Sequence, residues 1–199
     1  MGLWDRSPTF AYRHTSVLRF SPAFVKIIWL WLPFLLLAGC HKKDPSPEEQ
    51  LPAATQTGAN TFGCLVNGQV WMPQGNDGTS NYTVSYDTFP DGGLLEIATY
   101  RIYGQGVSDF QSLSLWTKQL NNPGTFSFQN TQTSIARFND QKTTCFWRSS
   151  DSNTYRRGTL TITRLDRQAG IISGTFAFTL YKAGCDSVHV TQGRFDKKL

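Results

Sequence analysis

The chain has 199 residues, with 19 Lys and Arg against 14 Asp and Glu, and a formal net charge of +5. Most of that excess charge precedes Cys40, where the sequence has four basic residues and one acidic residue. The remainder carries only about +2 and contains no block of like charges, which excludes the clustered basic face of a nucleic-acid-binding protein. The residues from Cys40 onward are numerous enough for one domain with its own core.

The segment Ile27–Cys40, IIWLWLPFLLLAGC, is typical of a secretory signal. Lys26 supplies a positive flank, an apolar run follows, and Leu37-Ala38-Gly39 places small residues before a cysteine. The run is shorter than the roughly 20 apolar residues of a spanning helix. We therefore predict a signal peptide over residues 1–39, with a short transmembrane anchor or an ordinary secretory signal as the alternatives.

The cysteine at the predicted cleavage site resembles the lipidation site of bacterial lipoproteins. That resemblance implies a diacylglyceryl thioether on Cys40, cleavage before its nitrogen and acylation there, so membrane lipid is the expected partner. Two or three acyl chains give lasting attachment, whereas one holds only marginally. His41 rather than Asp follows the cysteine, so we expect the outer membrane. Because 26 residues through Lys26 make a long charged leader, we also expect the native start downstream of Met1.

Residues 40–61 are predicted to be the lipidated cysteine and a flexible linker. The segment contains three prolines and few residues that a core could bury, so it cannot offset the entropy cost of ordering. A flexible coil of about 20 residues spans roughly 25 Å on average.

Residues 62–199 are predicted to form one antiparallel β domain. Short alternating segments recur between turn residues, and Asn67-Gly68 between apolar segments is a strong hairpin signal. Gly158–Leu165 and Ile171–Leu180 show the clearest strand patterns, and no convincing helix is present. About nine or ten strands at this spacing favour an all-β sandwich or barrel; the pattern does not separate the two.

Four segments of the domain are similar to an uncharacterised family of Bacteroidota lipoproteins whose domain has no known function. They are TGANTFGCLVNGQVW (57–71), GTLTITRLD (158–166), GIISGTFAFTL (170–180) and TQGRFDKKL (191–199). The similarity covers both ends of the domain and hardly touches 73–142. It implies an envelope β domain and assigns no catalytic residue.

Three cysteines follow Cys40 in what we expect to be an oxidising compartment. Cys64 lies between apolar neighbours, as a buried free thiol does, whereas Cys145 and Cys185 lie beside loops. We therefore predict a Cys145–Cys185 disulfide. A zinc site from these two cysteines and His189 is the alternative, but it lacks a fourth ligand and a close cysteine pair.

Residues able to carry catalysis are sparse, and we predict no catalytic residue, metal or cofactor. Glu96 is the only glutamate of the β domain, and the aspartates nearly all lie at expected turns, where they bond backbone amides. His189 alternates with Val188 and Val190, which places it on an outer face. No GxSxG motif accompanies any serine.

The aromatic residues are compatible with a binding function, whereas the sequence gives little support for catalysis. Aromatic and arginine side chains that could present a ligand surface are Trp71, Trp116, Trp147, Tyr155 and Arg156. Most aromatics of a β domain pack in the core or across strands. The leading hypothesis is a membrane-anchored, non-enzymatic envelope lipoprotein that serves as an interaction or structural module, with an unknown envelope protein or glycan as partner. The alternative is a small-ligand or glycan-binding protein, and a glycoside-active enzyme is third.

Overall fold

The computed structural model describes residues 44–89, 92–106 and 108–199, so the predicted signal peptide and Cys40 lie outside the described residues. Eleven strands are present in this part of the chain, where we expected nine or ten. Their bounds are β1 Thr61–Val66, β2 Gln69–Trp71, β3 Tyr82–Asp87, β4 Leu94–Ile102, β5 Phe110–Thr117, β6 Gly124–Ser127, β7 Ser134–Asp140, β8 Cys145–Arg148, β9 Thr154–Asp166, β10 Ile171–Lys182 and β11 Val188–Lys198.

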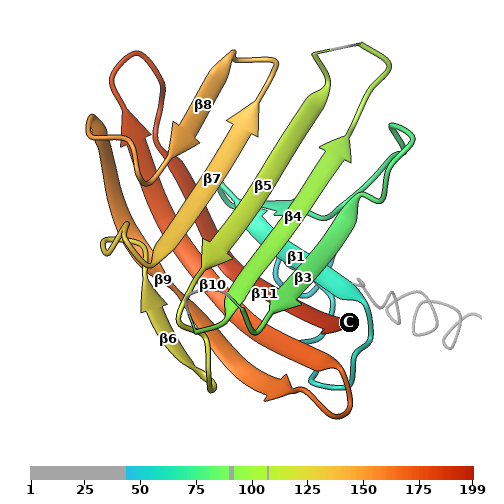
Figure 1. Ribbon diagram of the computed structural model, residues 1–199. Coiled ribbons are helices and arrows are strands. Elements are labelled where there is room, and N and C mark those ends of the chain that lie inside the picture. The colour runs from blue at the N-terminus through green and yellow to red at the C-terminus, as the bar shows by residue number, and fades with distance from the viewer. Residues whose placement is uncertain (1–43, 90–91, 107) are drawn as a thin grey trace, which may run out of the picture. The chain divides into compact units, whose positions relative to one another are not determined.

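The strands form two antiparallel sheets that pack face to face (Figure 1). One sheet has six strands in the order β2-β1-β11-β10-β9-β6, and the other has five in the order β3-β4-β5-β7-β8. The all-β prediction is therefore confirmed, and the fold is a sandwich of two sheets.

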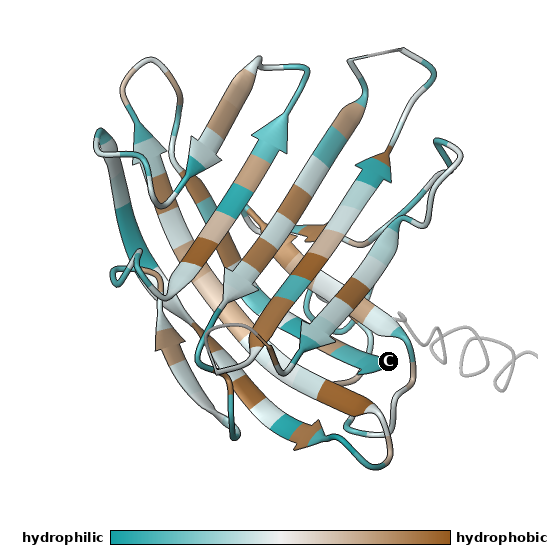
Figure 2. Ribbon diagram, viewed as in Figure 1, coloured by the Kyte–Doolittle hydropathy of each residue, from teal (hydrophilic) through white to brown (hydrophobic). Residues whose placement is uncertain are grey.

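The core lies between the sheets because the strands alternate. Leu95 and Ile97 of β4 and Leu113 and Leu115 of β5 are fully buried, while their neighbours in sequence face outward. The same alternation appears along β10 as bands of hydrophobic residues separated by paler ones (Figure 2). Period-two patterning thus selects the buried face of each sheet.

The predicted hairpin at Asn67-Gly68 is confirmed. It joins β1 to β2, and the two residues have φ angles of 51° and 80°. Turns of this kind require positive φ at both positions, which Asn and Gly tolerate best. The hairpin brings Trp71 opposite Cys64, on the inner face of the six-stranded sheet.

We predicted a flexible linker over residues 40–61, but residues 45–59 pack against the β domain. We name residues 45–59 the N-terminal strap. The chain from Pro45 to Leu199 forms one compact unit. Leu51 is buried, and a Cβ at Gly63 would lie 2.7 Å from Pro52 Cδ. Absence of a side chain at Gly63 therefore allows the strap to lie directly on β1. The composition of the segment did not predict this packing, because contacts from only Leu51 and Pro52 are enough to hold the strap where Gly63 leaves room for them.

The Asp196 carboxylate holds the strap at its other end. Thr55 Oγ1, the Thr57 amide and the Gly58 amide donate hydrogen bonds of 2.7 to 2.8 Å to it. Ser173 Oγ on β10 also donates, at 2.7 Å. Asp196 is only 1% exposed and lies within β11, so it is not the turn residue we expected.

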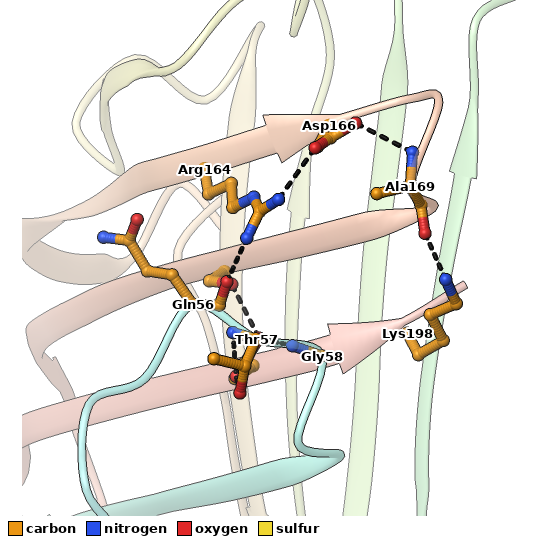
Figure 3. Close-up of polar contacts among 9 residues, drawn as sticks. Gln56, Thr57, Gly58, Arg164, Asp166, Ala169 and Lys198 are labelled. Carbon is orange, nitrogen blue, oxygen red and sulfur yellow. Dashed lines mark hydrogen bonds and ion pairs between the residues drawn. The ribbon is translucent and has the colours of Figure 1, made fainter.

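A second set of polar contacts surrounds this attachment (Figure 3). Arg164 donates to the Gln56 carbonyl and, at 2.7 Å, to Asp166. Asp166 also accepts the Ala169 amide at 2.8 Å in the β9–β10 turn, and the Lys198 ammonium donates to the Ala169 carbonyl. The strap, this turn and the C-terminal strand are thereby joined at one end of the sandwich.

Among the described residues, no helix has the length and apolar character needed to cross a membrane. The apolar run Ile27–Leu37 lies outside these residues, so the structure does not test the signal peptide.

Candidate ligand-binding cleft

A row of polar side chains crosses the five-stranded sheet at the end of the sandwich opposite the strap attachment. Arg101 of β4 pairs with Gln111 of β5, Gln111 pairs with Asp140 of β7, and Asp140 pairs with Cys145 of β8. These positions continue the inward-facing rows that include Leu113 and Phe138. β4, β5 and β7 thus each end their inner row with a polar residue at the upper edge of the sheet in Figure 1, while β8 contributes Cys145.

Two tryptophans and this polar row line a cleft of about 280 Å³. Trp71 comes from the six-stranded sheet and Trp147 from β8; they are 1% and 5% exposed. Trp71 Nε1 donates to Gln111 Oε1 at 3.0 Å, and Gln111 Nε2 donates to Asp140 Oδ2 at 2.9 Å. The apolar part of the lining also includes Val66, Val70, Phe138 and Val188. The volume lies just below the range that is typical of small-ligand sites.

Arg101 is the cationic group of the cleft. Its Nη1 donates to the Val70 carbonyl at 3.0 Å, and its guanidinium carbon lies 5.3 Å from the centre of the Tyr103 ring. Its Nε is buried and has no hydrogen-bond partner among the described residues. No carboxylate in the described part of the chain forms an ion pair with Arg101. The guanidinium is fixed and has no ion-pair partner within 4 Å among the residues described, so it can pair with an anionic ligand group, although the Asp140 carboxylate lines the same cleft.

The predicted Cys145–Cys185 disulfide is confirmed, with the two Cα atoms 5.9 Å apart. It links β8 to the loop between β10 and β11, and Trp147 Nε1 donates to the Asp186 carbonyl in that loop at 2.9 Å. The disulfide therefore fixes one wall of the cleft. Because both sulfurs are joined to each other, they cannot serve as the thiolate ligands of the alternative zinc site.

His189 lies on the exposed outer face, as expected, with its Nδ1 3.2 Å from Thr179 Oγ1. Within the residues that the structure describes, no group of three or more His, Cys, Asp or Glu side chains is placed to hold a metal ion.

The predicted aromatic surface is not a single surface. Trp71 and Trp147 line the cleft, whereas Trp116 lies on the outer face of the five-stranded sheet and Tyr155, 55% exposed, on the outer face of the other. Arg156 binds the carbonyls of Ser149 and Asp151 in the β8–β9 turn. Successive residues of one strand point to opposite faces, so the register of each strand decides which face its aromatic residue occupies.

Arg101, Gln111 and Asp140 are the cleft residues that the sequence reasoning missed. The available signal was the interruption of each apolar inner row by a polar residue at a strand end. Glu96, which an enzymatic function would need in a cleft, is exposed on the outer face of the five-stranded sheet. Several aspartates bond turn amides as predicted: Asp77, Asp87, Asp109, Asp140 and Asp166.

Cys64 is a buried free thiol, as predicted. Burial raises its pKa, and the positive charge of Arg101 opposes that shift only in part. The thiol therefore stays protonated at neutral pH, which fits a packing role against Trp71.

A family model described as Domain of unknown function (DUF6252) matches residues 95–197, slightly more than half of the chain. The match covers the segments 158–166 and 170–180 and most of 191–199, and it omits 57–71. It also covers part of the middle segment, 73–142, where we saw little similarity. Searches of curated proteins and of solved structures gave no match.

Proposed function

The chain belongs to the family described as Domain of unknown function (DUF6252), and we propose that it is an outer-membrane lipoprotein whose β domain is a non-enzymatic binding module. The lipid attachment on Cys40 is supported by the apolar run, the small residues and the cysteine at its end. The four similar segments support placing it with the Bacteroidota lipoproteins.

The observation that carries the binding role is the pair of tryptophans around Arg101. Because Trp71 and Trp147 are 1% and 5% exposed, only the edges of their indoles reach the cleft and supply apolar contact, while Gln111 and Asp140 supply polar groups in a fixed arrangement. Ligand sites commonly combine a mostly apolar lining with a few well-placed polar groups. This favours small-ligand binding over a purely structural role.

The ligand class that fits is a small, ring-shaped molecule with a carboxylate, such as an acidic sugar. The carboxylate would pair with Arg101, and hydroxyl groups would exchange hydrogen bonds with Asp140 and Gln111. The edges of the two indoles would contact one side of such a ring. The cleft volume of about 280 Å³ limits the bound part to about one ring.

Calorimetry with two related sugars tests this assignment. N-acetylmuramic acid carries a carboxylate that N-acetylglucosamine lacks, so we expect the acidic sugar to bind at least about tenfold more tightly. Arg101→Gln should weaken the acidic sugar by about tenfold or more, and Arg101→Lys by less.

Arg157→Gln is the matched control, because Arg157 is exposed on the outer face of the six-stranded sheet. It should leave both affinities unchanged. Absence of binding by both sugars, or equal affinity for the two, would contradict the assigned ligand class.

The anchor is tested separately by metabolic labelling with a palmitate analogue. The wild-type chain should be labelled and remain with the membrane, whereas Cys40→Ser should be neither labelled nor retained through lipid. An unlabelled wild-type protein, or an intact amino terminus upstream of Cys40, would overturn the proposed attachment without bearing on the cleft.

A further inference from the structure

Two arginines face each other on the outer surface of the five-stranded sheet, away from the cleft. Arg137 of β7 and Arg148 of β8 are direct cross-strand partners. The neighbouring side chains Phe138 and Trp147 are buried in the core, so alternation places both arginines on the opposite face. Like charges in directly opposite positions destabilise a sheet.

Neither arginine is neutralised by a close partner. The Nε atom of each is buried without a hydrogen bond to any described residue. Neither forms an ion pair within the part of the chain that the structure describes. Burial and the charge of Arg148 lower the pKa of Arg137, and the carboxylates of Glu96 and Asp151 oppose this shift without reaching ion-pair distance.

The outer face around the pair carries a hydroxyl group in its own row and an aromatic side chain in each neighbouring row, with Glu96 beside Trp116. Ser114 of β5 is the cross-strand partner of Arg137. The next row toward one end contains Trp116 beside Ile135. The next row toward the other end contains Phe146, 43% exposed, beside Asn139. Two guanidinium groups and a hydroxyl group thus lie between two aromatic side chains.

We propose that Arg137 and Arg148 together bind a phosphomonoester. A phosphate monoester carries between one and two negative charges at neutral pH and presents three acceptor oxygens. Two guanidinium groups can each donate two parallel hydrogen bonds to such a group. A bound dianion also converts the repulsion between the arginines into two attractions. The organic part of the ligand contacts Trp116 or Phe146.

Thermal unfolding and calorimetry of the full chain in detergent test the site with inorganic phosphate as the probe. At constant ionic strength, replacing chloride by phosphate should raise the melting temperature of the wild type, since a ligand of the folded state stabilises it. Arg137→Gln and Arg148→Gln should each weaken phosphate binding by about tenfold or more. Arg148→Lys should retain part of the affinity, because lysine keeps the positive charge but cannot donate two parallel hydrogen bonds.

Unfolding in chloride alone separates this site from a structural role of the two arginines. Arg148→Gln should melt at the wild-type temperature or above it, because the substitution removes a like-charge contact. Arg157→Gln should respond to phosphate as the wild type does. An identical phosphate response in all variants would overturn the proposal. The two charges would then serve only to oppose pairing of another strand with β8, which is an edge strand.

The source of the phosphate is distinguished by two ligands with the same headgroup. Glycerol 3-phosphate and dihexanoyl phosphatidic acid, used below its micelle concentration, differ only in the acyl chains. Equal affinities would identify a soluble phosphate ester, and tighter binding of the lipid would identify a membrane headgroup. Failure of both to bind would refute the site. The Arg101 variants report on the cleft independently.

Discussion

The indole Nε1 of Trp71 donates a 3.0 Å hydrogen bond to the side-chain oxygen of Gln111, and this bond joins the two sheets. Trp71 is buried, and Gln111 passes the connection on to Asp140 at 2.9 Å. The Gln111 side chain therefore accepts a hydrogen bond from a buried indole of the six-stranded sheet and donates one to a carboxylate of its own five-stranded sheet.

Gln111→Leu should lower the free energy of unfolding by about 1–3 kcal/mol, because it leaves the buried indole N–H of Trp71 without an acceptor. Urea unfolding followed by tryptophan fluorescence measures this change. Gln132→Leu, at an exposed turn position, is the control and should stay within about 0.5 kcal/mol. Equal stability of Gln111→Leu and the wild type would show that water replaces the lost acceptor.

Replacing both Cys145 and Cys185 by serine should destabilise the fold by about 4 kcal/mol, since the disulfide closes a loop with a sequence separation of 40. The same loss should follow when the wild type is unfolded in the presence of a reductant. The reductant should leave the double variant unchanged, because Cys64 is not bonded. A reductant effect that persists in the variant would point to a different bridge.

Asp196→Asn should reduce stability at neutral pH and remove part of the acid dependence of unfolding. Burial raises the pKa of this carboxyl, but hydrogen bonds from Thr55, Ser173 and the strap amides outweigh burial and lower the pKa overall. Its stabilisation is therefore present above the unfolded-state pKa of about 4 and is lost as pH falls below that value.

Denaturant unfolding at a series of pH values from neutral to strongly acidic measures this loss. Below about pH 4 the Asn variant should lose less stability than the wild type. Asp186→Asn is the control, because Asp186 is exposed and accepts the Trp147 bond through its backbone carbonyl. A parallel pH dependence of the wild type and Asp196→Asn would contradict the role of this carboxylate.

Gly63→Ala should release the strap while leaving the sandwich folded. A Cβ at this position would meet Pro52 Cδ at 2.7 Å, so the strap must shift away from β1. Hydrogen exchange followed by mass spectrometry should show faster exchange at the amides of Thr57, Gly58 and Ala59, and no change in β10. Gly68→Ala provides a comparison, because a side chain there meets no atom within 4 Å although its positive φ adds local strain.

Strand positions, the hairpin and the disulfide could be predicted because each has a local cause in the sequence. Alternation marks the strands, positive φ selects Asn67-Gly68, and loop positions favour Cys145 with Cys185. The attachment of Thr55 to Asp196 could not be predicted, since it joins residues 141 positions apart.

The polar row of the cleft escaped prediction for a related reason. Whether Arg101, Gln111 and Asp140 lie side by side depends on strand register, and the turns between β4, β5 and β7 set that register. Composition alone treats Trp71 and Trp116 as equivalent, although one lies in the cleft and the other on an outer face.

With the lipid that we propose on Cys40, the start of the strap would also limit how far the point of entry into the domain lies from the bilayer. Pro45 already belongs to the compact unit, so only five steps of chain separate it from the lipidated residue. Even fully extended, these steps cover no more than about 18 Å. In the proposed anchored form, the point where the chain enters the domain at Pro45 would therefore stay within about that distance of the lipid.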